Sequence, residues 1–319
     1  MKICIGTITR NRPDMLRALL ASYGRMRMPD GVEIIYAIAE NNPEVTIHAV
    51  VEEMRPALGG HRLLVEAEPR RGIPFARNHV LDMALAEGAD YLTFVDDDEQ
   101  VDADWLVNLL RMAREGDYDL VGAPVLIRDM PAGACGLAAI LWRGMVRRNA
   151  HVAKKARRRF AKKGPNSINV STANWLGRLD FFRRTGLRFD DGIGQGSGSD
   201  RRLYKDLVAK GGKAGWTIDA PVYDTVPLSR LTLSYQFKRG REHTAYLFAD
   251  SDRTGSMPRI MLLAKALGRI PRILASLVAI PFTGGESLLM ASRLAGDMVG
   301  FIDAYRGVFG SHYANVTGQ

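Results

Sequence analysis

The stretch Tyr91-Leu92-Thr93-Phe94-Val95-Asp96-Asp97-Asp98-Glu99 is a short apolar run that ends abruptly in a cluster of carboxylates. A continuous apolar run is typical of a central strand in a parallel sheet that is covered on both faces. Ligands of open α/β sheets bind beyond the carboxyl ends of the strands, which is where these aspartates would lie. The stretch therefore predicts a buried strand that opens into a ligand site.

The adjacent aspartates of this stretch also favour a metal ion. Like charges repel one another unless a cation or hydrogen-bond donors offset them. Mg2+ and Mn2+ take oxygen ligands and commonly share them with substrate phosphates. The alternative is an acidic turn that enters a helix, with Asp102 or Asp104 as its N-cap. The two interpretations are compatible, because the cap leaves the preceding triplet unexplained.

Apolar strands and amphipathic helices alternate along the first part of the chain. Helical spacing of apolar residues follows Pro13 and recurs from Phe75 to Ala86. The ranges that read as strands are 2–7, 32–39, 62–65, 91–95 and 120–123. Such alternation is typical of βαβ units, so the sequence predicts an α/β fold with a mostly parallel sheet.

Composition narrows the class of protein further. The 319 residues contain only two cysteines, Cys4 and Cys135, which argues against a disulfide framework and fits a reducing cytosol. The apolar run of Met1–Gly6 is too short for a signal peptide. No segment offers the roughly twenty apolar residues that span a bilayer. We therefore expect a cytoplasmic protein.

The net charge of +9 implies an anionic partner, and much of it lies between residues 143 and 163. That run has ten cations and no acidic residue, and it reads as a loop or helical excursion whose composition predicts mobility. Its partner is anionic lipid, nucleic acid or a diphosphate-bearing acceptor, and the alternative is a solvated basic face. Few aromatic residues interleave it, so nucleic acid is not the expected partner.

After Pro258 the chain has an amphipathic pattern in which basic residues punctuate apolar ones. This pattern favours interfacial helices on an anionic leaflet, and the alternative is helices that pack on the preceding domain or form a dimer contact. The domain prediction is a domain over 1–250, with halves 1–125 and 126–250, and a helical extension over 251–319.

Five motifs, taken in order, resemble the bacterial inverting glycosyltransferases of family 2, which share the GT-A fold. The motifs are Thr7-Ile8-Thr9-Arg10-Asn11-Arg12-Pro13, Gly72-Ile73-Pro74-Phe75-Ala76-Arg77-Asn78, Phe94-Val95-Asp96-Asp97-Asp98, Thr172-Ala173-Asn174 and Gly198-Ser199-Asp200. The resemblance covers roughly residues 1–250, and an ordered set is more specific than any single motif. In addition, Val222–Arg230 is similar to enzymes that build lipid-linked exopolysaccharide repeats, such as succinoglycan-type glucosyltransferases.

The resemblance implies a role for each matching position on the donor side. Glu40 stands where the family usually has an aspartate that contacts uracil, so the base preference is open. Asp98 would bind the Mn2+ or Mg2+ that bridges the diphosphate, and Asp97 fills the variable middle position of the Asp-x-Asp pattern. The other residues implied to bind the nucleotide-sugar are Thr7, Thr9, Arg10, Arg77 and Asp96.

On the acceptor side the resemblance implies Asp200 as the general base. The family commonly has Glu-Asp there, and this chain has Ser199-Asp200. Gln236 and Arg239 match a Gln-x-x-Arg-Trp motif of processive synthases, with Gly240 in place of tryptophan, and the alternative is that both are ordinary exposed helix residues. These two, with Asn174 and Trp175, are expected to contact the acceptor or its diphosphate.

The function that follows is transfer of a glucose-type hexose from a UDP-sugar to a lipid-diphosphate-linked glycan. One base and one Lewis acid support direct displacement with inversion. We expect the enzyme to act in exopolysaccharide or cell-envelope synthesis, as a peripheral protein at the inner face of the membrane. A nucleotidyltransferase and a non-catalytic binding protein for nucleotide-sugars or anionic polymers are the alternatives. The former usually has a glycine-rich loop where this chain has Thr9–Pro13.

Overall fold

The computed structural model describes residues 1–193, 198–253 and 260–307, without the side chains of 246, 247 and 249–253. These residues form two compact units. The first holds 1–126 and 151–224, and the second holds 127–150 and the described residues from 225 to 307. The Asp triplet belongs to the first unit.

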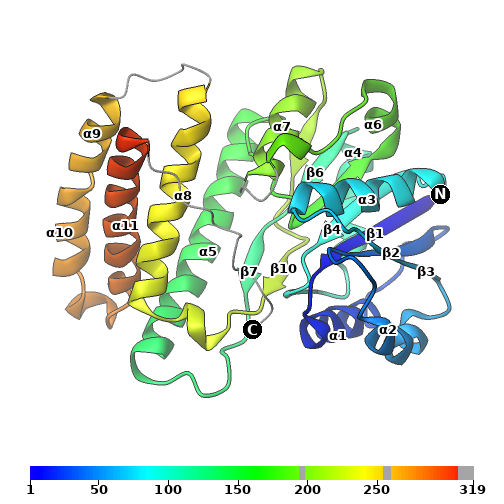
Figure 1. Ribbon diagram of the computed structural model, residues 1–319, viewed down its shortest axis with the longest axis horizontal. Coiled ribbons are helices and arrows are strands. Elements are labelled where there is room, and N and C mark those ends of the chain that lie inside the picture. The colour runs from blue at the N-terminus through cyan, green and yellow to red at the C-terminus, as the bar shows by residue number, and fades with distance from the viewer. Residues whose placement is uncertain (194–197, 254–259, 308–319) are drawn as a thin grey trace. The chain divides into compact units, whose positions relative to one another are not determined.

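The first unit is built on a seven-stranded sheet of order β3-β2-β1-β4-β8-β6-β9 (Figure 1). Its strands are β1 (Lys2–Thr9), β2 (Glu33–Glu40), β3 (Arg62–Ala67), β4 (Tyr91–Val95), β6 (Leu120–Gly122), β8 (Asn174–Arg178) and β9 (Ala214–Trp216). All neighbours pair in parallel except β8, which is antiparallel to both β4 and β6. The prediction of a mostly parallel sheet is confirmed.

Helices cover both faces of this sheet, which explains why β4 is apolar without alternation. Ile3 and Ile5 of β1 pack into one core cluster, and Cys4 between them packs into the other. Gly6 follows on the second face, where an added Cβ would lie 2.5 Å from Val80 of a covering helix. The helices of this unit are α1 (Pro13–Tyr23), α2 (His48–Met54), η1 (Arg55–Leu58), α3 (Ile73–Ala86), α4 (Trp105–Glu115), α6 (Leu179–Thr185), η2 (Asp191–Ile193) and α7 (Ser199–Ala209).

A small second sheet, of order β5-β10-β7, follows the carboxylate triplet. Its strands are β5 (Glu99–Val101), β10 (Val222–Asp224) and β7 (Val125–Ile127). β10 is antiparallel to β5, with Asp224 opposite Glu99. The chain that leaves β4 therefore turns through the triplet and enters a strand again at Glu99.

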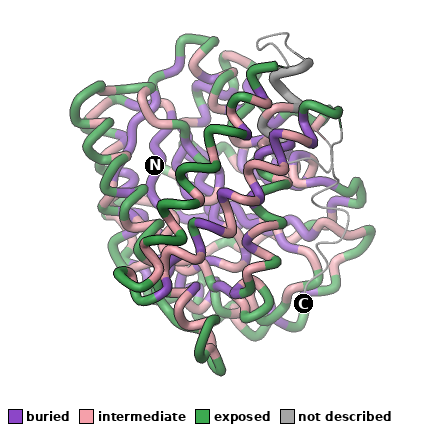
Figure 2. Tube along the Cα trace, turned by 90° about the vertical axis from the view of Figure 1, so that its left-hand side faces the viewer, coloured by how far each residue is buried: buried purple, intermediate pink, exposed green. Residues whose placement is uncertain are grey.

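The second unit is helical (Figure 1). Its elements are the first half of α5 (Gly136–Lys163), η3 (Leu228–Arg230), α8 (Leu233–Arg253), α9 (Ile260–Leu267), α10 (Ile270–Val278), η4 (Pro281–Thr283) and α11 (Ser287–Arg306). α8 and α11 lie close together because Gly240, Gly296 and Gly300 leave no room for a Cβ between their backbones. α10 buries no residue, and Figure 2 shows the side of the unit that α9 and α10 form as largely exposed.

The structure shows the form of the basic run and the length and apolar character of the helices. The basic run at 143–163 lies in α5, so a loop is wrong and a helical excursion is correct. Among the described residues, no helix has both the length and the apolar character needed to cross a bilayer.

Candidate active site

The carboxylate triplet follows β4, and its middle residue connects it to the end of β1. Asp97 is buried, and its side chain accepts hydrogen bonds from Thr9 Oγ1 at 2.7 Å and from Arg12 Nη1 at 3.0 Å. Arg12 Nη1 also lies 3.5 Å from Asp98 Oδ2. Asp97 therefore connects the first and third motifs.

The electrostatics of this turn favour a cation. Burial raises the pKa of Asp97 to about 6, with Arg12 opposing and Asp98 adding to the shift. Desolvation also raises the pKa of Asp96, against the effect of Arg77. Burial, followed by the charges of Asp96 and Asp98, raises the pKa of Glu99 well above its usual range. Burial, together with the charges of Asp96 and Asp98, thus disfavours the ionised forms of these carboxyls, which an added cation would offset.

Arg77 of α3 joins three of the motifs. It is buried, its Nη1 donates to Ser199 Oγ at 3.1 Å and its Nη2 lies 3.5 Å from Asp96 Oδ1. Its guanidinium lies 5.7 Å from the ring centroid of Phe189. The neighbouring Asn78 holds the Phe189 backbone through hydrogen bonds of 2.9 and 3.0 Å. The local fold therefore fixes Arg77 between Asp96, just after β4, and the start of α7.

Asp200, the expected base, lies in the first turn of α7. One of its oxygens accepts from Ser171 Oγ at 3.3 Å and the other from the Arg201 N–H at 2.9 Å. Its charge contributes to the raised pKa of Asp96, which places the two carboxylates in one electrostatic environment. The adjacent Ser199 accepts a hydrogen bond from Arg77, which connects the start of α7 with the surroundings of Asp96.

The expected donor-site residues Thr7, Glu40 and Arg10 differ in their hydrogen-bond partners. Thr7 is fully buried and shares a 3.2 Å hydrogen bond with Tyr23, so it does not line an open pocket. Glu40 is also fully buried, and its carboxylate accepts from Asn42, Thr46 and Ile47, which fixes the loop after β2. Arg10 differs from both, because its Nε is buried and has no hydrogen-bond partner among the described residues.

The expectation that Asn174 and Trp175 contact the acceptor is not met by their positions in β8. Both side chains are fully buried. Asn174 accepts from Trp105 Nε1 and donates to the carbonyls of Pro124 and Ala220 at 2.8 to 3.0 Å. The Trp175 ring stacks with Phe94 and Phe182, with centroids 5.7 and 5.8 Å away. Both residues therefore hold the sheet core together.

Gln236 and Arg239 lie on α8 of the second unit. Gln236 is fully buried, which makes the exposed-residue interpretation wrong for it. Its amide donates to the Arg230 carbonyl at 2.6 Å and accepts from Arg293 Nε at 2.7 Å. Arg239, one turn later, is exposed.

Four polar residues of the site have no role predicted from the sequence, namely Arg12, Ser171, Ser199 and Glu99. Arg12 and Ser199 stand inside quoted motifs, so their motif positions were the available signal. Within the described part of the chain, no group of three or more His, Cys, Asp or Glu side chains is arranged to hold a metal. The carboxylate oxygens of Asp96 and Asp98 nevertheless suit Mg2+ or Mn2+, which commonly bind one or two carboxylates and complete their coordination with substrate phosphates.

The fold and these contacts define a glycosyltransferase of the GT-A class. Residues 4–186, more than half of the chain, match the family model "Glycosyl transferase family 2", and the protein belongs to that family. It is 29% identical over 247 residues to "Succinoglycan biosynthesis protein ExoM" of Rhizobium meliloti (strain 1021), covering 76% of this chain and 74% of the relative. The nucleotidyltransferase and binding-protein alternatives are therefore not supported.

Solved structures support the same fold. S. aureus TarS 1-349 in complex with UDP matches with a TM-score of 0.52 and 15% identity, over 96% of this chain and 92% of that one. The match to the longer TarS chain covers only 55% of its length. The mannosyltransferase PcManGT from Pyrobaculum calidifontis, in complex with GDP-Man and Mn2+, matches with a TM-score of 0.58 and 15% identity, over 97% of this chain and 76% of that one.

Proposed function

We propose that this enzyme transfers a hexose of the glucose type from a UDP-sugar to a lipid-diphosphate-linked glycan, with inversion at the sugar. The observation that carries the proposal is the bridge that Arg77 makes between Asp96 and Ser199, next to Asp200. This bridge brings the donor-side carboxylate and the acceptor-side carboxylate to one place. The name of the R. meliloti relative supports an exopolysaccharide product.

On the donor side, the proposed nucleotide-sugar contacts are Thr9, Arg10, Arg77 and Asp96. The buried Nε of Arg10, which has no partner in the part of the chain that the structure describes, supports its role, since a buried donor without a partner is unfavourable until a ligand accepts from it. Thr7 and Glu40 support the site without contacting the nucleotide-sugar. Thr7 shares a hydrogen bond with Tyr23, and Glu40 holds the loop after β2. The base preference stays open, because one structural neighbour binds UDP and another GDP-Man.

Asp98, with Asp96 beside it, would hold Mn2+ or Mg2+. When bound, the ion supplies positive charge that stabilises the leaving diphosphate. Arg12 serves the same end, because it lies 3.5 Å from Asp98 and its positive charge persists at every working pH. Asp97 keeps Arg12 in this position.

For the chemical step, we propose Asp200 as the general base. The acceptor hydroxyl loses its proton to an Asp200 oxygen while the new bond forms between the acceptor oxygen and the sugar C1. The bond from C1 to the diphosphate oxygen breaks with its electron pair, and the nucleoside diphosphate leaves. Ser171 and the Arg201 N–H orient the Asp200 carboxylate through their hydrogen bonds. A single displacement of this kind inverts the configuration at C1.

We further propose that the second unit associates with an anionic membrane surface, on the cytoplasmic side. Its α9, α10 and η4 expose large apolar side chains, of which Phe282 is 86% exposed, Val278 70% and Ile260 67%. Between Ile260 and Gly285 the only charged residues are Lys265, Arg269 and Arg272. An apolar surface with cations and no acids suits insertion among anionic headgroups.

The proposed donor site is tested by calorimetric titration with UDP in Mn2+, in Mg2+ and in EDTA, with GDP as the comparison nucleotide. We expect metal-dependent binding to wild type that is lost in Asp98→Ala. Asp200→Asn, the matched carboxylate variant, should bind UDP as wild type does and transfer no sugar. Binding that is equal in EDTA and in Asp98→Ala would contradict the metal site, and sugar transfer by Asp200→Asn would contradict the base.

A further inference from the structure

Three arginines come together in the second unit from three different helices, namely Arg148 of α5, Arg239 of α8 and Arg293 of α11. The charge of each acts on at least one of the others, and Gln236 of α8 contacts the two helices that hold Arg148 and Arg293. The Oε1 of Gln236 accepts from Arg293 Nε at 2.7 Å, and its Nε2 lies 3.7 Å from Met145 Sδ on α5. Gln236 thus connects all three helices at one level.

Helix geometry brings the other two arginines to the same place. Arg148 follows Met145 by three residues on α5, and Arg239 follows Gln236 by three residues on α8. Residues three apart lie on one face of a helix, so both arginines lie about one turn beyond the contact between Met145 and Gln236. Gly240 leaves no room for a Cβ against the Arg293 backbone, which shows that α8 and α11 are closely packed at this point.

The cluster is short of negative charge. Desolvation, followed by the charges of Arg148 and Arg239, lowers the pKa of Arg293. Desolvation and then Arg239 likewise lower the pKa of Arg148. In the described part of the chain, Asp297 is the carboxylate that opposes these shifts, and it also accepts from Thr244 at 3.0 Å and lies 3.8 Å from Arg269 Nε. Holding these cations together is unfavourable until an anion joins them.

We propose that Arg148, Arg239 and Arg293 form a binding site for the diphosphate group of the lipid-linked acceptor, an assignment that rests on the proposed function. Guanidinium groups present several donors in a rigid fork, which matches the oxygens of phosphate esters. A diphosphate offers two phosphoryl groups and so engages more than one fork at a time. The nucleotide's diphosphate already has a candidate site at the Asp triplet of the first unit.

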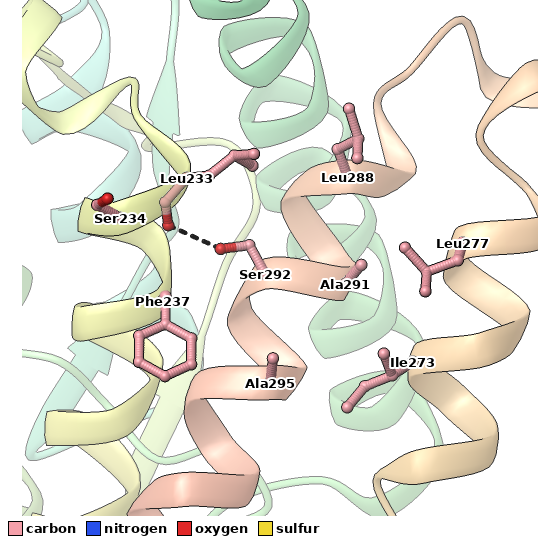
Figure 3. Close-up of a pocket in the computed structure, with 9 residues that line it drawn as sticks. All are labelled: Leu233, Ser234, Phe237, Ile273, Leu277, Leu288, Ala291, Ser292 and Ala295. Atoms are coloured by element: carbon pink, nitrogen blue, oxygen red, sulfur yellow. Dashed lines mark hydrogen bonds between the residues drawn. The ribbon is translucent and has the colours of Figure 1, made fainter.

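The apolar groove of this unit is a separate feature. Its volume is about 510 Å³, and it is lined by α8, α10 and α11, with Phe237, Ile273 and Leu277 facing it (Figure 3). Phe237 and Arg239 are two residues apart on α8, which separates their directions by about 200° around the helix axis. The groove therefore lies on the other side of α8 from the arginines, and the diphosphate site does not depend on it.

The site is tested with inorganic pyrophosphate and the full-length protein in EDTA, where no metal assists the Asp triplet. Calorimetric titration should show binding to wild type that weakens about ten-fold or more in Arg239→Gln and in Arg293→Gln, since each loses a charge-assisted hydrogen bond. Arg306→Gln, at the exposed end of α11, is the matched control and should bind as wild type does. Arg148→Gln serves as the second variant if Arg293→Gln fails to fold. Absent binding to wild type, or equal binding by all variants, overturns the proposal.

A second arm identifies the source of the diphosphate. The same arginine variants should bind geranylgeranyl diphosphate in detergent more weakly than wild type does. They should bind UDP with Mn2+ as tightly as wild type does. Equal loss of UDP affinity in Arg239→Gln would assign the arginines to the donor and overturn the acceptor assignment. A wild type that binds pyrophosphate in EDTA but no nucleotide would contradict the proposed donor site and leave the arginine site intact, so the two failures are distinguishable.

Discussion

The hydroxyl of Thr9 donates a 2.7 Å hydrogen bond to Asp97, although 88 residues separate the two in sequence. Asp97 also accepts from Arg12 at 3.0 Å. Through these bonds the end of β1 and the end of β4 form one rigid corner. The parallel pairing of β1 with β4 brings the two strand ends together, and the buried carboxylate then fixes the side chains that leave them.

Replacing this anchor should weaken both fold and donor site. Asp97→Asn removes the charge that Arg12 faces and should lower the free energy of unfolding by about 1 to 3 kcal/mol. Thr9→Val removes one hydrogen bond only and should lower it by about 1 kcal/mol. Urea unfolding measures both, and UDP titration with Mn2+ should show weaker binding in Asp97→Asn. Wild-type stability and affinity in Asp97→Asn would mean that Asp97 is only a spacer.

Arg77→Lys tests the bridge on which the proposed function rests. A lysine ammonium cannot reach both Ser199 Oγ and Asp96 Oδ1 in the way the guanidinium fork does. We expect the UDP affinity to fall by roughly ten-fold, or about 1.4 kcal/mol. The matched control is Arg71→Lys at an exposed position nearby. Calorimetry on variants with verified melting curves measures the effect, and an unchanged Kd in Arg77→Lys would refute the role of the bridge.

Much of the fold could be predicted because local patterns carry it. The β4 run and the helical spacing of Leu16, Leu19 and Tyr23 report burial directly, and the structure places all of these residues in the core. The antiparallel direction of β8 was not predictable, since strand direction depends on pairing between distant segments rather than on local pattern. The sequence does not decide between a loop and a helix at 143–163, because the dense positive charge there resembles that of a mobile segment.

The candidate site was predictable only as far as motifs locate it. A motif places residues near a site without saying which way each side chain points. Asn174 and Trp175 illustrate the limit, since both belong to β8, which begins at the last residue of the fourth motif, and both point into packed surroundings. Partners such as Ser199 for Arg77 depend on tertiary contacts between residues 122 apart, which no single sequence reveals.

Asn174→Ala should therefore affect stability rather than acceptor binding. The change leaves the Trp105 indole N–H and two backbone carbonyls without their buried partner. We expect the free energy of unfolding to fall by about 2 to 4 kcal/mol, while the acceptor KM of the folded fraction stays within roughly three-fold of wild type. Asn108→Ala, which removes a bond to the Asp219 carbonyl, should cost about 1 kcal/mol and serves as the comparison. A large rise in acceptor KM with unchanged stability would restore Asn174 to the acceptor site.

The pH dependence of stability should contain a contribution from Glu68. Hydrogen bonds from Arg70 lower the pKa of this buried carboxyl in the folded protein. A lowered pKa stabilises the fold above the unfolded value, roughly 4.3, and that stabilisation is lost as the pH falls through the folded pKa. Glu68→Gln should thus be less stable than wild type at pH 7 and approach wild type below about pH 4. Urea unfolding across this range is the measurement, with exposed Glu44→Gln as the control, and a difference independent of pH would exclude the linkage.

The membrane contact proposed for the second unit can be tested at its most exposed apolar positions. Phe282 is 86% exposed and Val278 is 70% exposed, so their replacement by serine should not disturb a core. Insertion of each side chain into the interface contributes up to about 1.5 to 3 kcal/mol, so Phe282→Ser with Val278→Ser should reduce retention on anionic vesicles by ten-fold or more. Met130→Ser, at a 48% exposed residue outside α9 and α10, is the control and should be retained as wild type is. Flotation at two salt concentrations separates the apolar from the electrostatic part, and undiminished retention of the double variant would rule out this surface as the membrane contact.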